Sequence, residues 1–216
     1  MDAPFAEAFG DSEQMGRRFL SERRIGFVKI RRDKTYLGPF DMTFIETKIS
    51  GVFEIHPELV HDERGFFARS WCQSEFASHG LNSRLVQCNI SSSLRKGTLR
   101  GMHYQAAPFA ESKLIRCTRG SIFDVALDLR PDSPTYKWWT AAVLSAENHL
   151  MLCVPEGCAH GFLTLEDDCE VFYQMSEFYH PEAARGVRWN DPAFGIDWPG
   201  KVVVISARDA SYLDFA

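Results

Sequence analysis

The stretch Ser121-Ile-Phe-Asp-Val-Ala-Leu-Asp-Leu-Arg130 carries the clearest structural signal in the chain. Val125 and Leu127 alternate with Asp124 and Asp128, which places apolar side chains on one face and acidic side chains on the other. A period of two residues is typical of a β-strand, because successive side chains point to opposite faces. The pattern predicts a strand with one face in a core and the other in solvent.

Runs of the same kind follow one another on both sides of this stretch, separated by turn-forming residues. The expected strands lie at 43–49, 51–55, 66–71, 85–90, 98–104, 113–118, 122–129, 138–144, 150–154, 159–165 and 170–176. Helical patterns are scarce. One short helix is expected at 74–79, with Ser74 as its N-cap and Gly80 just past its end. Many short strands at close spacing predict an all-β fold, either a sandwich or a barrel.

Residues 1–42 differ from the rest of the chain. Arginines cluster there, no regular period runs through them, and only 12–24 has the pattern of a short helix. We expect an N-terminal extension at 1–42, followed by one folded domain at 43–216. A chain of 216 residues is long enough for one sizeable core with such an extension.

Composition and charge argue against several classes of protein. The net charge of −5 gives no general attraction to nucleic acid or to an anionic membrane, and no apolar run could span a bilayer. The N-terminus lacks the apolar segment of a secretory signal, so we expect a cytoplasmic protein. The six cysteines form no Cys-x-x-Cys pair and are expected to be reduced packing residues. The sequence also contains no dinucleotide fingerprint, phosphate-binding loop or nucleophilic-serine elbow.

A metal site needs separate consideration, because many small β-barrels hold a metal with histidines. The natural place for one is the stretch ending in His103-Tyr104-Gln105, where the second position of a His-x-His pair is occupied by Gln105. An amide is a poor ligand beside imidazole, and His160 would add only one more nitrogen. We therefore expect no metal and no other cofactor.

Three residues fit a reaction that needs neither a metal nor a cofactor. His103 has a side chain suited to act as a base near neutral pH. Lys113 and Tyr173 each share a strand face with apolar residues, so both are expected to point inward. A base, a cation and a phenol suit proton abstraction next to a carbonyl, in which the cation stabilises the enolate. Each residue also has a structural interpretation, as a core histidine, a surface lysine with a buried stem and a barrel-filling tyrosine.

Longer motifs add a resemblance. The stretches Asp62-Glu-Arg-Gly-Phe-Phe67, Gly97-Thr-Leu-Arg-Gly-Met-His-Tyr-Gln105 and Pro155-Glu-Gly-Cys-Ala-His-Gly-Phe162 resemble the dTDP-4-dehydrorhamnose 3,5-epimerase family. Further similar blocks lie at 87–91, 113–117, 124–130, 133–135, 189–192 and 206–209. The resemblance is collinear over roughly residues 43–210 and leaves out the N-terminal extension. It implies a cupin-like jelly-roll barrel with a few short helices, and a homodimer whose subunits exchange N-terminal strands.

The resemblance also implies roles for individual residues. His103 would be the general base, oriented by Asp209, while Lys113 would stabilise the enolate formed at C4 and Tyr173 would reprotonate the opposite face. The remaining positions would hold the dTDP-sugar. Arg64 and Arg100 would bind the diphosphate, Phe67 and Tyr179 would stack on the base, Gln87 and Asn89 would make polar contacts to the nucleotide end, and His160 would line the pocket.

Two local features of the sequence depart from a simple match. Arg69 occupies a position near which many family members carry a carboxylate, which predicts a change in sugar or nucleotide preference. Arg100 and His103 would face opposite sides of a regular strand, so we expect Gly101 to bulge or bend the strand between them.

The activity expected is epimerisation at C3 and C5 of dTDP-4-keto-6-deoxyglucose, giving dTDP-4-keto-L-rhamnose. Alternatives are an epimerase of one carbon only, an epimerase of another nucleotide sugar, a binding barrel without catalysis, and a metal-dependent cupin enzyme. The set formed by His103, Lys113, Tyr173 and Asp209 argues against a pure binding protein, and Gln105 argues against the metal enzyme.

Overall fold

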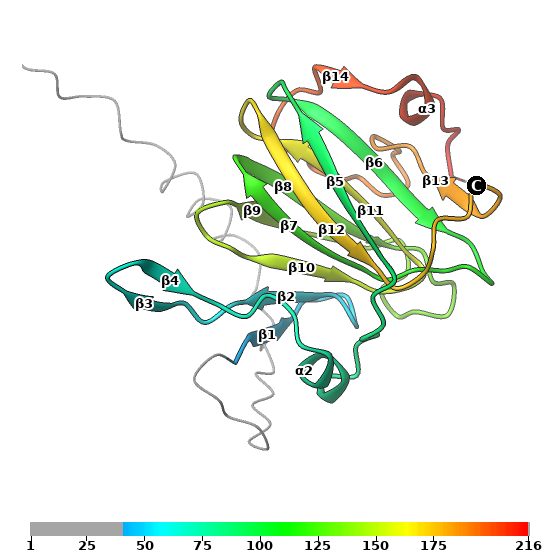
Figure 1. Ribbon diagram of the computed structural model, residues 1–216. Helices are drawn as coiled ribbons and strands as arrows, with labels where there is room; N and C mark the ends of the chain where they lie inside the picture. The colour runs from blue at the N-terminus through cyan, green and yellow to red at the C-terminus, as the bar shows by residue number, and fades with distance from the viewer. Residues whose placement is uncertain (1–40, 216) are drawn as a thin grey trace, which may run out of the picture.

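The computed structural model describes residues 41–215, and these form two antiparallel sheets packed face to face with two short helices. The first sheet has the order β1 (Thr43–Glu46), β2 (Phe53–His56), β10 (Met151–Val154), β7 (Lys113–Arg119), β12 (Cys169–Met175) and β5 (Gln87–Ser93). The second has β13 (Ala184–Gly186), β6 (Thr98–Gln105), β11 (Cys158–Thr164), β8 (Ser121–Asp128) and β9 (Trp139–Ser145), with β14 (Val204–Ile205) parallel to β6. Figure 1 shows the two layers. The all-β jelly-roll prediction is confirmed.

The expected helix at 12–24 and most of the expected extension lie outside the described residues. Within residues 41–215, no helix is long and apolar enough to cross a membrane. All six cysteines are free thiols and four of them are buried, as expected for packing residues.

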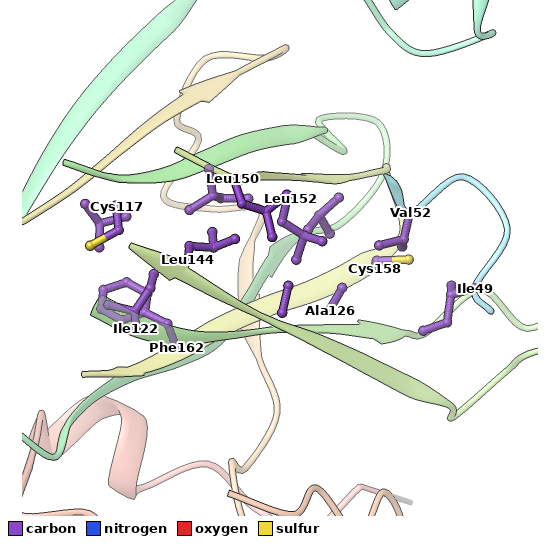
Figure 2. Packing of buried hydrophobic residues seen from close by; sticks show 14 of the residues in the cluster. Ile49, Val52, Cys117, Ile122, Ala126, Leu144, Leu150, Leu152, Cys158 and Phe162 are labelled. Carbon is purple, nitrogen blue, oxygen red and sulfur yellow. The ribbon is translucent and has the colours of Figure 1, made fainter. Parts of the chain in front are cut away.

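The main core fills the space between the two sheets. Cys117 and Leu152 from the first sheet meet Ile122, Leu144 and Phe162 from the second (Figure 2). Each of these side chains comes from a strand whose alternate residues point inward, so the core follows directly from the period of two.

The prediction that one face of β8 meets solvent is wrong, because both faces are buried. Val125 and Leu127 point outward but are covered by the C-terminal segment, in which Val187 and Phe194 pack on them. The acidic face points into the barrel, where Asp128 is fully buried.

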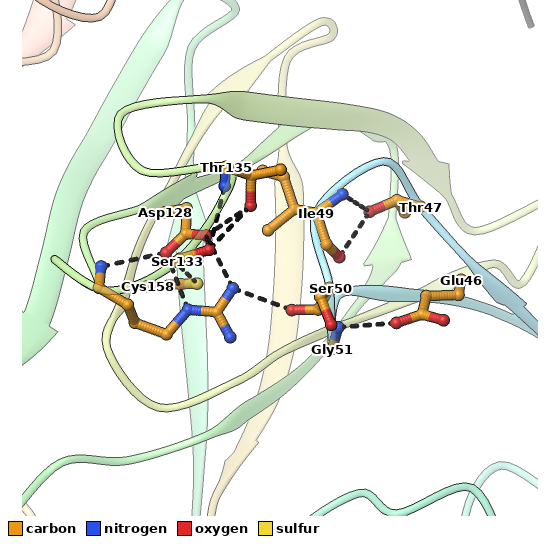
Figure 3. Close-up of polar contacts among 10 residues, drawn as sticks. Glu46, Thr47, Ile49, Ser50, Gly51, Asp128, Ser133, Thr135 and Cys158 are labelled. Carbon is orange, nitrogen blue, oxygen red and sulfur yellow. Dashed lines mark hydrogen bonds and ion pairs between the residues drawn. The ribbon is translucent and has the colours of Figure 1, made fainter. Parts of the chain in front are cut away.

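Asp128 is buried at little cost because its carboxylate is saturated with hydrogen bonds (Figure 3). Arg130 donates from Nε and Nη2 at 2.8 Å each, while the hydroxyls of Ser133 and Thr135 donate at 2.6 and 2.7 Å. Burial opposes ionisation, but these donors hold the pKa of Asp128 well below its usual range. Arg130 also donates to the Ser50 carbonyl at 2.9 Å, so one buried carboxylate joins two loops.

The helix α2 (Gln73–Ser78) differs from its prediction by its start. Its N-cap is Cys72, which makes no side-chain cap, and Ser74 lies inside the first turn. What positions the helix is packing rather than capping: Phe76 is buried against Phe44 on β1, with ring centroids 5.3 Å apart. The helix thereby covers the outer face of the first sheet.

A separate hairpin projects from the barrel beyond β2 (Figure 1). It consists of β3 (Val60–Asp62) and β4 (Gly65–Phe67), and the strand expected at 66–71 ends early at Phe67. Pairing stops there because Phe67 lies opposite Val60, the first residue of the partner strand. The short strands β3, β13 and β14 were not predicted.

Candidate active site

A cavity of about 720 Å³ opens between the two sheets. Strands β5, β7 and β12 form one wall, β6 and β11 form the other, and the helix α3 (Ala207–Ala210) closes one side. Nine of the eleven predicted site residues line it: Gln87, Asn89, Arg100, His103, Lys113, His160, Tyr173, Tyr179 and Asp209. The other two, Arg64 and Phe67, do not.

His103 and Asp209 form a close pair at the cavity wall, with 2.7 Å between His103 Nε2 and Asp209 Oδ1. Asp209 is carried by α3, whose N-cap Ser206 accepts the Asp209 N–H at 3.0 Å. Its second oxygen accepts the Gly101 N–H at 3.2 Å. Burial opposes ionisation of this carboxyl, but the neighbouring imidazole and these donors hold its pKa below the usual value.

This geometry fixes the tautomer of His103. An ionised carboxylate only accepts hydrogen bonds, so the proton is on Nε2 and a lone pair is left on Nδ1. The side chain of His103 is 40% exposed, whereas that of Asp209 is 5% exposed. The imidazole is therefore open to a bound molecule while its orienting partner is shielded from water.

The predicted bulge at Gly101 is confirmed and resolves the problem of Arg100 and His103. His160 pairs with His103 and Phe162 pairs with Arg100, so two residues of β6 lie opposite the single residue Gly161. Both Arg100 and His103 consequently line the cavity. A Cβ on Gly101 would lie 2.5 Å from the Gly161 Cα, and Gly101 has a φ of +142°, so only glycine fits there.

Lys113 is buried and has two partners. Its ammonium lies 2.8 Å from Glu111 Oε1 and donates to the His103 carbonyl at 3.0 Å. Glu111 is itself buried and accepts the Gln105 N–H at 2.9 Å. The Lys113 side chain is thus fixed between β7 and β6, with a carboxylate beside it inside the barrel.

A second His–Asp pair lies beside the first. His160 Nε2 is 2.7 Å from Asp124 Oδ1, and His160 is the neighbour of His103 across β11 and β6. Asp124 has no exposed surface, and this burial raises its pKa despite the nearby His160 and Lys113. Its Oδ2 has no hydrogen-bond partner among the described residues.

Tyr173 stands on the opposite wall. It lies on β12, opposite Asn89 of β5 and Ile115 of β7, and packs against the main core. Burial raises the pKa of its phenol, so the hydroxyl keeps its proton at neutral pH. A protonated phenol facing the cavity is a proton donor.

The polar residues at the mouth are linked to one another. Gln87 accepts the Tyr179 N–H at 3.0 Å and donates to Asn89 Oδ1 at 3.1 Å. Arg100 is anchored to β5, donating to Ser93 Oγ at 3.2 Å and to the Ser92 carbonyl at 2.7 Å. These bonds present an amide pair, a tyrosine and a guanidinium along one edge of the cavity.

Arg64 and Phe67 lie on the β3–β4 hairpin, which projects from the barrel (Figure 1). Neither residue lines the cavity of its own chain. The Arg64 guanidinium pairs with Asp62 through Nε at 3.1 Å and through Nη2. Phe67 is 62% exposed. The isolated chain therefore does not bring these two residues to the site.

Sequence reasoning missed Glu111, Asp124 and Arg208. Glu111 precedes the strand of Lys113 in a loop without a period, so no pattern marked it. Asp124 was placed on the wrong side because the acidic face of β8 was assigned to solvent. Arg208 lines the cavity from α3 beside Asp209, and its guanidinium interacts with Tyr179. Its adjacency to Asp209 was the available signal.

Gln105, at the position of the missing metal ligand, has a structural role. Gln105 donates from Nε2 to the carbonyls of Phe109 and Phe178 at 2.9 and 3.1 Å and accepts the His180 N–H at 2.7 Å. It therefore links two loops at the cavity.

Among residues 41–215, no three His, Cys, Asp or Glu side chains gather in a way that could hold a metal ion.

Arg69 contacts helix α2 rather than the cavity. Its guanidinium pairs with Glu75 and lies 3.5 Å from Asp41. Its contacts join the start of the described chain to the helix, and they show no link with the recognition of sugar or nucleotide.

The cavity as a whole can support one kind of chemistry. A base with a fixed lone pair stands on one sheet and a phenol that keeps its proton stands on the other, while a buried ammonium from the phenol's sheet reaches across to the backbone of the base. This arrangement suits removal of a proton next to a carbonyl and its return on the other face.

Comparisons with known proteins agree with this assignment. The sequence model of the family described as dTDP-4-dehydrorhamnose 3,5-epimerase matches residues 46–216. The dTDP-4-dehydrorhamnose 3,5-epimerase of Methanothermobacter thermautotrophicus is 46% identical over 175 residues, which cover 80% of this chain and 94% of the relative.

Solved structures give the same result. The dTDP-4-dehydrorhamnose 3,5-epimerase of Bacillus anthracis, with TDP and PPi bound, is 40% identical with a TM-score of 0.78, covering 81% of this chain and 100% of that one. The 3,5-epimerase of Legionella pneumophila, in complex with dTDP-4-keto-L-rhamnose, is 39% identical with a TM-score of 0.75, covering 80% and 92%. With both its sequence and its fold shared over the whole jelly roll, the chain belongs to the dTDP-4-dehydrorhamnose 3,5-epimerase family.

Proposed function

We propose that this protein inverts C3 and C5 of dTDP-4-keto-6-deoxyglucose, giving dTDP-4-keto-L-rhamnose, without a cofactor. The observation that carries the proposal is the placement of His103 and Tyr173 on opposing walls of one cavity, with the Lys113 ammonium bound to the His103 carbonyl. Family membership supports the same substrate class, since the relatives carry this activity in their names.

Each inversion follows from this arrangement. His103 Nδ1 takes the proton from the carbon beside the C4 carbonyl, and the electrons of the C–H bond move into the carbonyl, which becomes an enolate. Lys113 stabilises the enolate oxygen, held in place by Glu111. As the carbonyl re-forms, the carbon takes the Tyr173 proton from the opposite face. Exchange with solvent then restores the imidazole and the phenol, and the same steps serve the second carbon.

The edge of the cavity would hold the nucleotide. Arg100 and Arg208 supply guanidinium groups for the diphosphate, and Tyr179 supplies a ring for stacking on the base. Gln87 and Asn89 lie where amides would contact the nucleotide end. His160, buried beside His103, would line the sugar subsite.

The activity is tested by incubating the purified protein with the 4-keto sugar in D₂O and following C3 and C5 by NMR. Deuterium at both carbons with inversion supports the proposal, and deuterium at one carbon selects a mono-epimerase. Binding without any exchange would instead identify a nucleotide-sugar-binding barrel. A stoichiometric metal ion required for turnover would refute the metal-free mechanism.

Two variants separate the roles of base and acid. His103→Ala should abolish exchange at both carbons, because no other group in the mechanism removes the proton. Tyr173→Phe should still exchange, because His103 can return a solvent-derived deuteron to the same face, but it should not invert. Inversion at the normal rate in Tyr173→Phe would assign the acid to another residue.

Arg64 and Phe67 fit a homodimer in which each hairpin reaches the cavity of the other subunit. Support comes from the projection of the hairpin, from the exposure of Phe67 and from the dimer that the family resemblance implies. Co-expression of Arg64→Ala with His103→Ala tests this arrangement. A mixed dimer contains one cavity with His103 intact that receives an intact Arg64, so activity should return. If it does not, Arg64 does not act in the partner's site.

We also place the protein in the cytoplasm and the catalytic unit at 43–216. Free cysteines fit a reducing compartment, and the family match begins only at residue 46. A chain lacking residues 1–41 should retain its activity and its dimeric state. Loss of either would give the extension a role in the enzyme.

A further inference from the structure

Helix α3 carries Asp209 but is only four residues long, so it needs support from outside itself. Support comes from the segment that follows it. The Phe215 N–H donates to Asp191 Oδ2 at 2.6 Å, and the Phe215 ring lies 5.1 Å from that of Phe194. Asp214 forms an ion pair with Arg188. The tail is therefore anchored on the far side of Tyr212, while α3 fixes it on the near side.

Tyr212 lies in a slot that exists only because residue 186 is glycine. A Cβ built on Gly186 would lie 2.1 Å from Tyr212 Cζ and 2.3 Å from Cε2, far inside van der Waals contact. Gly186 belongs to β13 and pairs directly with His103 of β6. The tyrosine ring thus packs on the backbone beside the residue that would act as base.

The same ring meets the imidazole of His103. The ring centroids are 6.4 Å apart with an interplanar angle of 69°, an edge-to-face contact. Tyr212 is not among the residues that line the cavity, so it stands behind His103 rather than beside the substrate. Its buried hydroxyl makes no hydrogen bond of good geometry among the described residues, although it interacts with the Arg208 guanidinium. The contact with His103 is made by the ring.

We propose that Tyr212 is a positioning residue, which confines the His103 imidazole so that Nε2 stays on Asp209 and Nδ1 stays aimed into the cavity. Asp209 alone fixes one atom of an imidazole that is 40% exposed and leaves the ring free to pivot about that bond. The edge of Tyr212 blocks this pivot. The inference rests on the proposed function for its kinetic consequence, but the orientation of His103 can be measured without substrate.

The first test compares variants that keep or remove the ring. Tyr212→Leu retains apolar volume over Gly186 but removes the edge facing His103, and should lower kcat for exchange by roughly 10- to 100-fold, with KM changed less than about threefold. Tyr212→Phe keeps the ring and should restore kcat. Leu213→Ala serves as the control, because Leu213 is 86% exposed and should leave kcat unchanged.

The second test uses the slot itself. Gly186 has no positive φ, so Gly186→Ala is compatible with its backbone and acts only by displacing the Tyr212 ring. As a single substitution, Gly186→Ala should lower kcat for exchange relative to the wild type. In the Tyr212→Ala background the new Cβ has room, so the double variant should be no slower than Tyr212→Ala. If the loss of kcat in the double variant were the product of the losses in Gly186→Ala and Tyr212→Ala, the two positions would act independently and the proposal would be overturned.

The third measurement is the ¹⁵N spectrum of His103 in the free enzyme. Tyr212→Leu should broaden or shift the Nδ1 and Nε2 resonances, whereas Tyr212→Phe should match the wild type. A wild-type spectrum and wild-type kcat in Tyr212→Leu would refute the positioning role. If the wild type showed no epimerase activity, the proposed function would fail while this spectroscopic result still decided the role of Tyr212.

Discussion

Replacing Asp209 by asparagine should disable the base by changing which nitrogen of His103 carries the proton. The carboxylate accepts two hydrogen bonds, from His103 Nε2 at 2.7 Å and from the Gly101 N–H at 3.2 Å. Asparagine offers one oxygen and one NH₂ group. If its oxygen faces Gly101, the NH₂ group faces Nε2, and the imidazole must move its proton to Nδ1. The lone pair that would take the substrate proton is then lost.

The other orientation of the asparagine amide keeps the His103 tautomer but leaves two hydrogen-bond donors facing each other. The Gly101 N–H would meet the NH₂ group, and a buried donor without a partner costs about 1–3 kcal/mol. The wrong tautomer is favoured by that amount, which corresponds to a loss of about 5- to 150-fold at 1.36 kcal/mol per factor of ten. The charge that stabilises the imidazolium is lost as well. The wrong tautomer and the lost charge together approach the fall in kcat of about 10⁴-fold that the matching Asp→Asn change causes in a Ser-His-Asp triad.

The assay is deuterium exchange from D₂O into the 4-keto sugar, followed by NMR under single-turnover conditions. The matched control is Asp197→Asn, which removes an exposed carboxylate from the C-terminal segment and should keep its exchange rate. A rate for Asp209→Asn within threefold of the wild type would refute the tautomer argument. So would a ¹⁵N spectrum showing the wild-type tautomer together with a full loss of rate, since the charge alone would then account for it.

Three further predictions concern residues that support the site. Glu111→Gln leaves the Lys113 ammonium buried without a counter-charge, so chemical denaturation should show a loss of about 3–5 kcal/mol; a loss below 1 kcal/mol would contradict the pairing. Gln105→Leu removes three hydrogen bonds between the loops near Tyr179 and should raise KM roughly tenfold with little change in kcat, measured by steady-state kinetics; an unchanged KM would show that the loops hold without it. Asp128→Ala should lower the melting temperature at neutral pH. Because the pKa of Asp128 is lowered by folding, its stabilisation is full above the unfolded value of about 3.9 and is lost as pH falls through the folded one, so the difference should shrink in acid; a constant difference would contradict this.

The sequence predicted the strands and most of the cavity because alternation marks which side chains point inward. Lys113 and Tyr173 were assigned to the interior from their apolar neighbours, and both lie there. Alternation does not say which face of a strand is covered, however. Asp124 was therefore assigned to solvent, although a segment more than sixty residues later covers the opposite face of β8.

Other features depend on contacts that no local pattern encodes. Glu111 meets Lys113 from an irregular loop, and the cap of α2 falls on Cys72 because the helix is held by Phe76 in the core. Arg64 and Phe67 were recognised from a motif, but they lie on the β3–β4 hairpin and do not line the cavity of their own chain. A sequence motif does not record where in the fold its residues come together.

The bulge in β6 makes the cavity depend on one irregular step in the strand. Arg100 and His103 are three residues apart, a spacing that puts side chains on opposite faces of a regular strand. Their partners Phe162 and His160 are two residues apart, and the extra residue of β6 at Gly101-Met102 absorbs the difference, so both side chains reach the cavity. A register slip that removed the bulge while keeping both residues would turn His103 and every later side chain of β6 to the other face. The close approach of Gly101 to the Gly161 Cα therefore maintains more than local packing, because it holds the irregular step on which the shared site depends.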